Sequence, residues 1–327
     1  MAEKKQEFKF PTETVDLPSG GKVYPKDSPL SSGKIDIKYM TAKEEDNLTS
    51  QNLIKKGIVI TQLLNSLIVS EGVSSDDLVL GDKNAVMVAS RILAYGPEYT
   101  VEVTNPNTGN LFEHTFDLTE CEFKNISDDI NGNEFEVELP YSKVKVKFKL
   151  LNGHDESNID KELESYKKVG GSVLPELTTR LKYTIVSVND NDTKSVISNF
   201  VDNMLSRDSL FLRSEIKRVS PDIDLTQEIE IEGETVTVTI PMAVNFFGLT
   251  PSHKPQIHEE IFQLVFYGQG FTHADVYGMP IYLRKFYFNK LLDVKKEEKK
   301  QIDKAAKKSN TPVYRPNIPK SGKFPRR

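Results

Sequence analysis

The sequence contains no tryptophan and only one cysteine, Cys121, among its 327 residues. A single thiol excludes an internal disulfide bond and any zinc site built from several thiolates. The sequence has no run of about 18 apolar residues, so it predicts no membrane-spanning helix. The first ten residues, MAEKKQEFKF, are charged and lack the apolar stretch of a secretory signal. We therefore expect a protein suited to a reducing interior or to an assembly that needs no covalent cross-links.

The sequence also lacks the common signatures of catalytic and metal-binding sites. Residues 20–22 (GGK) do not have the spacing of a phosphate-binding loop and predict a hairpin turn instead. The five histidines show no zinc-binding spacing, and no G-x-S-x-G motif is present. The adjacent acids at 44–45 and 155–156 fit stabilisation of a positive helix end better than acid–base catalysis. We therefore expect no enzyme, no metal and no cofactor.

Charge is unevenly distributed along the chain. The formal net charge is -5, but residues 284–327 hold 15 Lys and Arg against 4 Asp and Glu. This segment therefore contributes +11 and the remaining residues -16. A basic end on an acidic body can bind nucleic acid or an acidic partner, and a solvated, partly disordered terminus is the simpler interpretation.

An internal repeat is the most informative feature that the sequence does contain. Residues 35–48 (IDIKYMTAKEEDNL) align without a gap with residues 146–159 (VKFKLLNGHDESNI), 111 positions later. In both segments, alternating apolar residues predict a strand and an acidic cluster predicts the start of a helix. Two such copies predict tandem modules, an arrangement more common in scaffolding proteins than in enzymes with one pocket.

The same order of elements is predicted in both modules. The elements expected in the first are helices at about 42–56 and 57–70, a helix capped by Asp82, and a hairpin over 99–116. Those expected in the second are a hairpin, helices from about 155 and at 174–187, 193–205 and 208–219, and a hairpin that turns at 232–233.

These patterns predict an α+β fold with two similar tandem modules of β-hairpins packed with helices, followed by a C-terminal helical segment and a disordered basic tail. The expected boundaries are an extended N-terminal arm or edge hairpin over 1–34, modules over 35–130 and 131–250, helices over 251–308, and the tail over 309–327.

The turn at 105–109 (NPNTG) has the layout of a zinc knuckle, C-P-x-C-G, with both sulfur positions replaced. Asn and Thr supply no thiolate, so we expect no zinc here. Descent from a zinc-binding hairpin and an ordinary Asn/Pro/Gly turn explain the pattern equally well.

The C-terminal helices carry a stripe of aromatic residues beside cations, with a break at residues 278–280 (GMP). Exposed aromatics next to cations are good anchors for a protein interface. Packing of the same rings into the protein's own core is the alternative. The residues predicted to bind a partner are Phe271, Tyr277, Tyr282, Arg284, Phe286 and Tyr287, with Phe288 in the same stripe.

Two segments resemble a known family. Residues 17–57 contain, in order, LPS-x-G, a Tyr-Pro turn, a strand and an MTA-x-x-E helix start. This order resembles the N-terminal signature of the baseplate hub subunit family of T4-like contractile-tailed bacteriophages. Residues 240–251 (IPMAVNFFGLTP) resemble the segment after that family's second hairpin, and the likeness spans roughly residues 8–250. The cysteine knuckles of some relatives are absent here, which puts any zinc dependence in doubt.

Residues 261–292 separately resemble tail-assembly chaperone modules, which carry an M-P turn and a helix with Arg and aromatics. Together the resemblances imply a non-enzymatic phage tail morphogenesis protein, a baseplate hub subunit or hub assembly factor. Its expected partners are other phage tail or baseplate hub proteins, including the tape-measure protein, in the virion or in the host cytoplasm during assembly. The alternatives are a transient tape-measure chaperone that is absent from the virion and a nucleic-acid-binding module that uses the basic tail.

Overall fold

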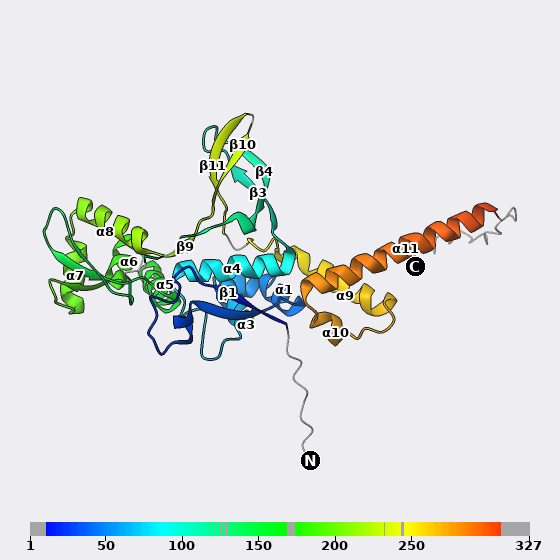
Figure 1. Ribbon diagram of the computed structural model, residues 1–327, viewed down its shortest axis with the longest axis horizontal. Helices are drawn as coiled ribbons and strands as arrows, with labels where there is room; N and C mark the ends of the chain where they lie inside the picture. The colour runs from blue at the N-terminus through cyan, green and yellow to red at the C-terminus, as the bar shows by residue number, and fades with distance from the viewer. Residues whose placement is uncertain are drawn as a thin grey trace, which may run out of the picture.

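The computed structural model describes residues 11–124, 126–127, 130–168, 174–231, 233–242 and 245–308. The predicted α+β class is confirmed, because helices pack with small antiparallel sheets. The molecule is elongated, with hairpins projecting from its middle and a long helix from one end (Figure 1). In the described ranges, no helix has the length and apolar character needed to span a bilayer. The predicted tail at 309–327 lies outside the described residues.

The first module contains the predicted strand, helices and hairpin. Its elements are β1 (Thr12–Asp16), η1 (Pro29–Ser32), β2 (Lys34–Lys38), α1 (Ala42–Leu48), α2 (Gln51–Lys55), α3 (Val59–Leu67), α4 (Leu80–Tyr95), β3 (Glu98–Thr104), β4 (Leu111–Asp117), η2 (Leu118–Glu120) and β5 (Phe123–Lys124). The helix expected over 42–56 is divided in two, because Thr49 and Ser50 leave helical geometry between α1 and α2.

Residues 11–34, the described part of the expected N-terminal arm, pack closely against the first module. β1 pairs with β2 in antiparallel register, and Leu17 and Leu30 are buried in the first module's core. Gly21 has a φ of 80°, and a Cβ there would stand 2.4 Å from the Ser31 carbonyl oxygen, so this turn requires glycine. The domain boundaries that we proposed from the sequence stay a prediction.

The second module follows the same order with one correction. Its elements are β6 (Phe135–Glu138), β7 (Lys145–Phe148), α5 (Gly153–Lys168), α6 (Glu176–Thr184), β8 (Ile185–Val188), α7 (Lys194–Asp202), α8 (Ser206–Val219), β9 (Asp222–Ile223), β10 (Thr226–Ile231) and β11 (Glu234–Thr239). The helix expected over 174–187 ends at Thr184. The β-branched residues that follow form β8, because pairing with β7 buries them in a sheet.

The repeat seen in the sequence is also a repeat of contacts. Lys38 and Glu44 form an ion pair of 3.2 Å, and 111 residues later Lys149 and Asp155 form one of 2.8 Å. A matching backbone contact also follows one helix in each module. Ile68, directly after α3, forms a bridge with β2, and Ile185, directly after α6, pairs with β7. Equivalent pairs at equivalent positions support two copies of one module.

A buried aspartate near the start of a helix anchors a loop in each module. Asp82 was predicted to cap its helix, but it is the third residue of α4 and is fully buried. It accepts hydrogen bonds from the backbone N–H and hydroxyl of Ser19, at 2.9 and 2.6 Å, and from the Tyr24 hydroxyl at 2.6 Å. Asp208, the third residue of α8, accepts the N–H groups of residues 141–142, both at 3.0 Å.

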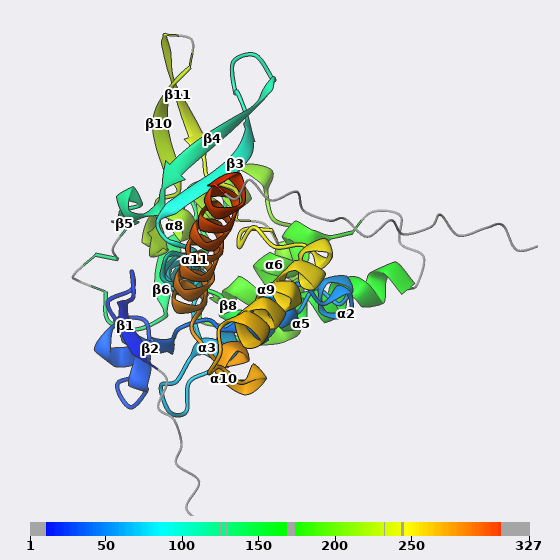
Figure 2. The same ribbon diagram turned by 90° about the vertical axis from the view of Figure 1, so that its right-hand side faces the viewer.

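The two projecting hairpins, β3–β4 and β10–β11, lie side by side (Figure 2). Both contribute to the same hydrophobic core, with Tyr99 and Phe116 from the first hairpin and Val236 and Val238 from the second. The chain therefore returns to the first module after it has formed α8. At the NPNTG turn, the Asn105 side chain accepts backbone N–H groups, which is ordinary Asx-turn chemistry.

We predict that Asp82→Asn destabilises the fold by about 1.5–3 kcal/mol, because hydrogen bonds to a charged acceptor are lost and an amide donor faces Ser19 and Tyr24. The free energy of unfolding in urea measures the effect. Asp160→Asn, at an exposed position on α5, is the control and should leave stability unchanged. Equal stability of the two variants would show that Asp82 does not anchor the loop.

Candidate functional site

The C-terminal helices dock on the first module and extend beyond it. After η3 (Pro251–His253), α9 (Lys254–Tyr267) and α10 (His273–Tyr277) lead to α11 (Ile281–Lys308). The predicted helix break at residues 278–280 is confirmed. The apolar contact between these helices and α1 is made by Ala42, Ile257, Ile261, Leu264 and Val276. The far half of α11 projects from the body (Figure 1).

Asp46 of α1 ties α9 and α10 to the first module. Its carboxylate lies 3.1 Å from Lys254 Nζ and 3.2 Å from His258 Nε2, and it accepts the Tyr277 hydroxyl at 2.7 Å. Burial alone would raise the pKa of Asp46, but the hydrogen bonds from Tyr277 and Lys254 outweigh it and hold the pKa below its ordinary value. The ionised carboxylate therefore stabilises the docked helices.

A buried ion pair holds α11. The side chains of Arg284 and Glu45 are only 1% and 2% exposed, and Arg284 Nη2 lies 2.6 Å from Glu45 Oε2. Glu260 of α9 stands 3.6 Å from Arg284 Nε, and the Tyr95 hydroxyl donates to Glu45 Oε1 at 3.2 Å. Burial raises the pKa of Glu45, while Arg284 acts in the opposite direction.

The first turn of α11 rests on a surface that we call the first docking site, formed by Tyr39, Met40, Glu45 and Tyr95. The Ile281 N–H donates to the Met40 carbonyl at 2.9 Å, and the Tyr282 ring lies 5.3 Å from the Tyr39 ring. Lys285 Nζ stands 4.6 Å from the centre of the Tyr95 ring, in a cation–π contact. Backbone, aromatic and ionic contacts thus combine to fix the start of α11.

The predicted partner-binding residues divide into exposed and packed groups. Tyr282, Phe286 and Tyr287 are 48%, 52% and 37% exposed, so their rings are available on the surface. Phe271 and Tyr277 are partly buried against the core beneath α9. Phe288 packs there too.

Arg284 requires a correction. We predicted that it would bind a partner, but its buried guanidinium pairs with Glu45 inside the protein and cannot reach one. The sequence places Arg284 between aromatics, and its acidic partner lies on a distant helix. Its role is to hold α11 in place.

A second group of exposed rings, which we did not predict from the sequence, lies on α9. Phe262, Phe266 and Tyr267 are all exposed, and the first two stack at 5.5 Å between centroids. Ile257, Ile261 and Leu264 form the buried face of α9, so helical spacing alone would have placed Phe262 and Phe266 on another face. We call the six side chains Phe262, Phe266, Tyr267, Tyr282, Phe286 and Tyr287 the exposed C-terminal rings.

The chemistry available here is that of association. Over the described part of the chain, no three His, Cys, Asp or Glu side chains gather in a way that could hold a metal ion. Exposed aromatic groups of this size on neighbouring helices are typical of surfaces that bind another protein.

One comparison with known proteins gives a match. A family model described as T4 bacteriophage base plate protein matches residues 10–248. This range covers both modules and the hairpins, and it ends before α9 begins at Lys254. No curated protein and no solved structure matches.

We predict that Arg284→Met releases α11 from the first module. Removing one partner of a buried pair leaves Glu45 as an uncompensated charge, at a cost of about 3–5 kcal/mol. Hydrogen exchange at the amides of α11's first turns should accelerate strongly. Lys290→Met, an exposed cation on the same helix, should leave that exchange unchanged; equal rates in the two variants would contradict the prediction.

Asp46→Asn tests, through its pH dependence, the contacts by which Asp46 ties α9 and α10 to the first module. Because the pKa of Asp46 is lower in the folded chain than its ordinary value, its contribution is present above about pH 4 and is lost as pH falls through the folded pKa. The variant should therefore be less stable than the parent at neutral pH, and the gap should close on acidification. Urea unfolding at several pH values measures this, and a gap that widens below about pH 4 would contradict it.

Proposed function

The chain belongs to the T4 bacteriophage base plate protein family, and we propose that it serves there as a baseplate hub subunit or hub assembly factor. Membership itself assigns it a structural or assembly role in the phage baseplate, with other tail or baseplate proteins as partners. The hub assignment is the finer step, and the resemblance of residues 17–57 and 240–251 to the hub subunit family supports it. We propose that it acts without catalysis, by presenting surfaces.

The exposed C-terminal rings carry this proposal. Aromatic side chains are the commonest anchors of protein interfaces, since they bury a large area at a small cost in side-chain entropy. Lys290 and Lys295 lie over the rings of Phe286 and Tyr267, at 5.8 and 5.5 Å, so cations accompany the aromatics. A partner with apolar and acidic groups would match both features.

The outer half of α11 points to the same conclusion. Every side chain from residue 293 to residue 305 is exposed, although the helix runs to Lys308. A helix that is solvated all round gains little from its own packing, and the contacts found here lie at the surface, such as the Lys295–Glu298 ion pair at 2.9 Å and the cation–π contact of Lys295 with Tyr267. Such a helix becomes well packed when a partner covers it.

The alternative is a transient chaperone for the tape-measure protein. The family match ends at residue 248, so the helices that resemble chaperone modules lie outside it. The two proposals differ in whether the chain remains in the finished virion.

A tagged full-length chain, expressed in phage-infected cells, separates these functions. Recovery of hub or tape-measure proteins by mass spectrometry, with the chain also present in purified virions, is the result expected of a hub subunit. The same partners with the chain absent from virions would favour the chaperone. Recovery of nucleic acid alone would overturn both and assign function to the basic tail.

We predict that Tyr282→Ala with Phe286→Ala weakens partner binding at least 100-fold, since each buried aromatic anchor contributes about 2 kcal/mol or more. Recovery of partners from infected cells and thermal unfolding are measured together. Tyr166→Ala, an exposed tyrosine on α5, is the matched control. If the double variant folds and still recovers its partners, the exposed C-terminal rings are not the binding surface.

A further inference from the structure

The projecting hairpins and the C-terminal segment carry opposite charge. Residues 98–122 and 222–240, which contain the hairpins β3–β4 and β10–β11, hold six Asp or Glu each and no Lys or Arg. They therefore contribute -12 of the -16 that residues 1–283 carry, whereas residues 284–327 contribute +11. The hairpins project from the middle of the molecule, and the outer half of α11 leads away from them at one end (Figure 1). The acidic hairpins and the lysine-rich outer half of α11 are thus separated in space.

The outer face of the β3–β4 hairpin is a sheet face on which every side chain is exposed. Alternate residues of both strands face the core, and the others form this outer face: Glu98, Thr100, Glu102, Thr104, Leu111, Glu113, Thr115 and Asp117. The register places Glu98 opposite Asp117, and four residues further along it places Glu102 opposite Glu113. Like charges directly opposite each other on neighbouring strands destabilise a sheet. A cation placed between either pair would therefore relieve the repulsion between its carboxylates.

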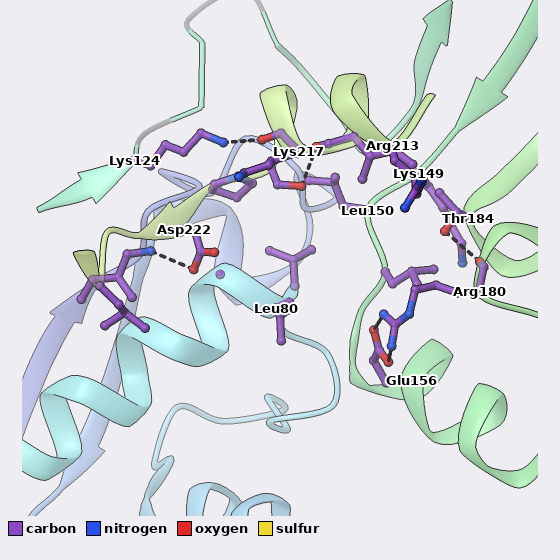
Figure 3. Close-up of a pocket in the computed structure, with 18 of the residues that line it drawn as sticks. Leu80, Lys124, Lys149, Leu150, Glu156, Arg180, Thr184, Arg213, Lys217 and Asp222 are labelled. Carbon is purple, nitrogen blue, oxygen red and sulfur yellow. Dashed lines mark hydrogen bonds and ion pairs between the residues drawn. The ribbon is translucent and has the colours of Figure 1, made fainter. Parts of the chain in front are cut away.

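Basic side chains at the foot of the second hairpin do not neutralise these acids. A cavity of about 830 Å³ at that foot is bordered by five cations (Figure 3), namely Lys124, Lys149, Arg180, Arg213 and Lys217. Lys124 donates to the Lys217 backbone carbonyl. Lys149 and Arg180 bind carboxylates of α5. Across the described ranges, no ion pair involves an acid of β3, β4, β10 or β11, so the hairpins keep their negative charge.

The outer half of α11 provides a row of cations with a matching spacing. Lys296, Lys300 and Lys304 recur every four residues, which places them on one side of the helix, and all three are exposed. Eight residues of helix separate the outer two by about 12 Å, and four residues of strand separate the two carboxylate pairs by about 13 Å. The middle lysine would then meet the hydroxyls of Thr100 and Thr115, which lie 2.8 Å apart between the two pairs.

We propose that α11 of one copy of this chain lies across the outer face of the β3–β4 hairpin of a second copy, with Lys296 and Lys304 each placed between two opposed carboxylates. The helix comes from a second copy because α11 packs on α4 and α9 of its own copy and leads away from its own hairpins (Figure 1). Each copy offers one acidic face and one basic helix, so the contact is heterologous and can join successive copies. It goes beyond the proposed function and does not depend on the hub assignment.

Sedimentation velocity of the purified full chain tests this contact. Exposed ion pairs are individually weak and are screened by salt. We therefore expect the chain to associate at about 0.05 M salt, and the dissociation constant to rise at least about tenfold at about 0.5 M salt.

Charge reversal identifies the two surfaces. Glu102→Lys with Glu113→Lys, and in a separate chain Lys296→Glu with Lys304→Glu, should each weaken association at low salt at least about tenfold, because like charges then meet. An equimolar mixture of the two variants should associate again, since the hairpin of one variant is still acidic and α11 of the other is still basic.

Matched charge changes on exposed α5 are the controls. Asp160→Lys with Glu164→Lys, and Lys161→Glu with Lys167→Glu, should leave association unchanged. Thermal unfolding checks that every variant folds. If the hairpin variant does not fold, Glu102→Gln with Glu113→Gln replaces it, because that pair of changes removes the repulsion between the strands.

Four results would overturn the inference. The first is a parent chain that stays monomeric at low salt, and the second is an association that salt does not weaken. The third is a mixture of the folded variants that fails to associate. The fourth is an association that survives both charge reversals but is lost in Tyr282→Ala with Phe286→Ala, which would assign the contact between copies to the exposed C-terminal rings.

Discussion

A buried carboxylate at the start of α1 determines how the chain is arranged around it. Glu45 is almost fully removed from water, and a buried charge of this kind costs several kcal/mol unless a cation compensates it. The compensating cation, Arg284, lies on the last helix of the described chain. Pairing therefore obliges α11 to return to the first module, and the exposed C-terminal rings are presented from that fixed base.

The repeat shows a second solution to the same constraint. At the equivalent position of the second module, Glu156 is paired by Arg180 of the neighbouring α6, and the pair is partly exposed. Both copies of the site are nevertheless filled from within the chain: α11 begins on the turn before α1, where the Ile281 N–H donates to the Met40 carbonyl, and the segment before α4 lies on the turn before α5, where Val79 bridges Asn152. Both copies of the repeated segment thus serve as attachment points for another part of the same chain.

Local patterns predicted most of the elements, and distant contacts account for what they missed. Alternating apolar residues and acidic helix starts predicted the hairpins and the repeat. The same reasoning failed at Asp82, whose partners come from a loop about sixty residues earlier, and at residues 185–188, where pairing with β7 overrides an apolar run that also fits a helix. Local patterns also predicted Tyr282 and Phe286 as exposed interface residues, and both rings are exposed. The burial of Arg284 could not be predicted in this way, because it depends on Glu45, which lies far away in the sequence.

A double-mutant cycle tests the central claim that the buried pair organises the molecule. Glu45→Gln and Arg284→Met are measured singly and together by urea unfolding, beside a second cycle with Glu156→Gln and Arg180→Met. We expect a coupling of about 1–3 kcal/mol for the buried pair and at most about 1 kcal/mol for the partly exposed pair. A coupling between Glu45 and Arg284 near zero, or below that of the second pair, would contradict the account.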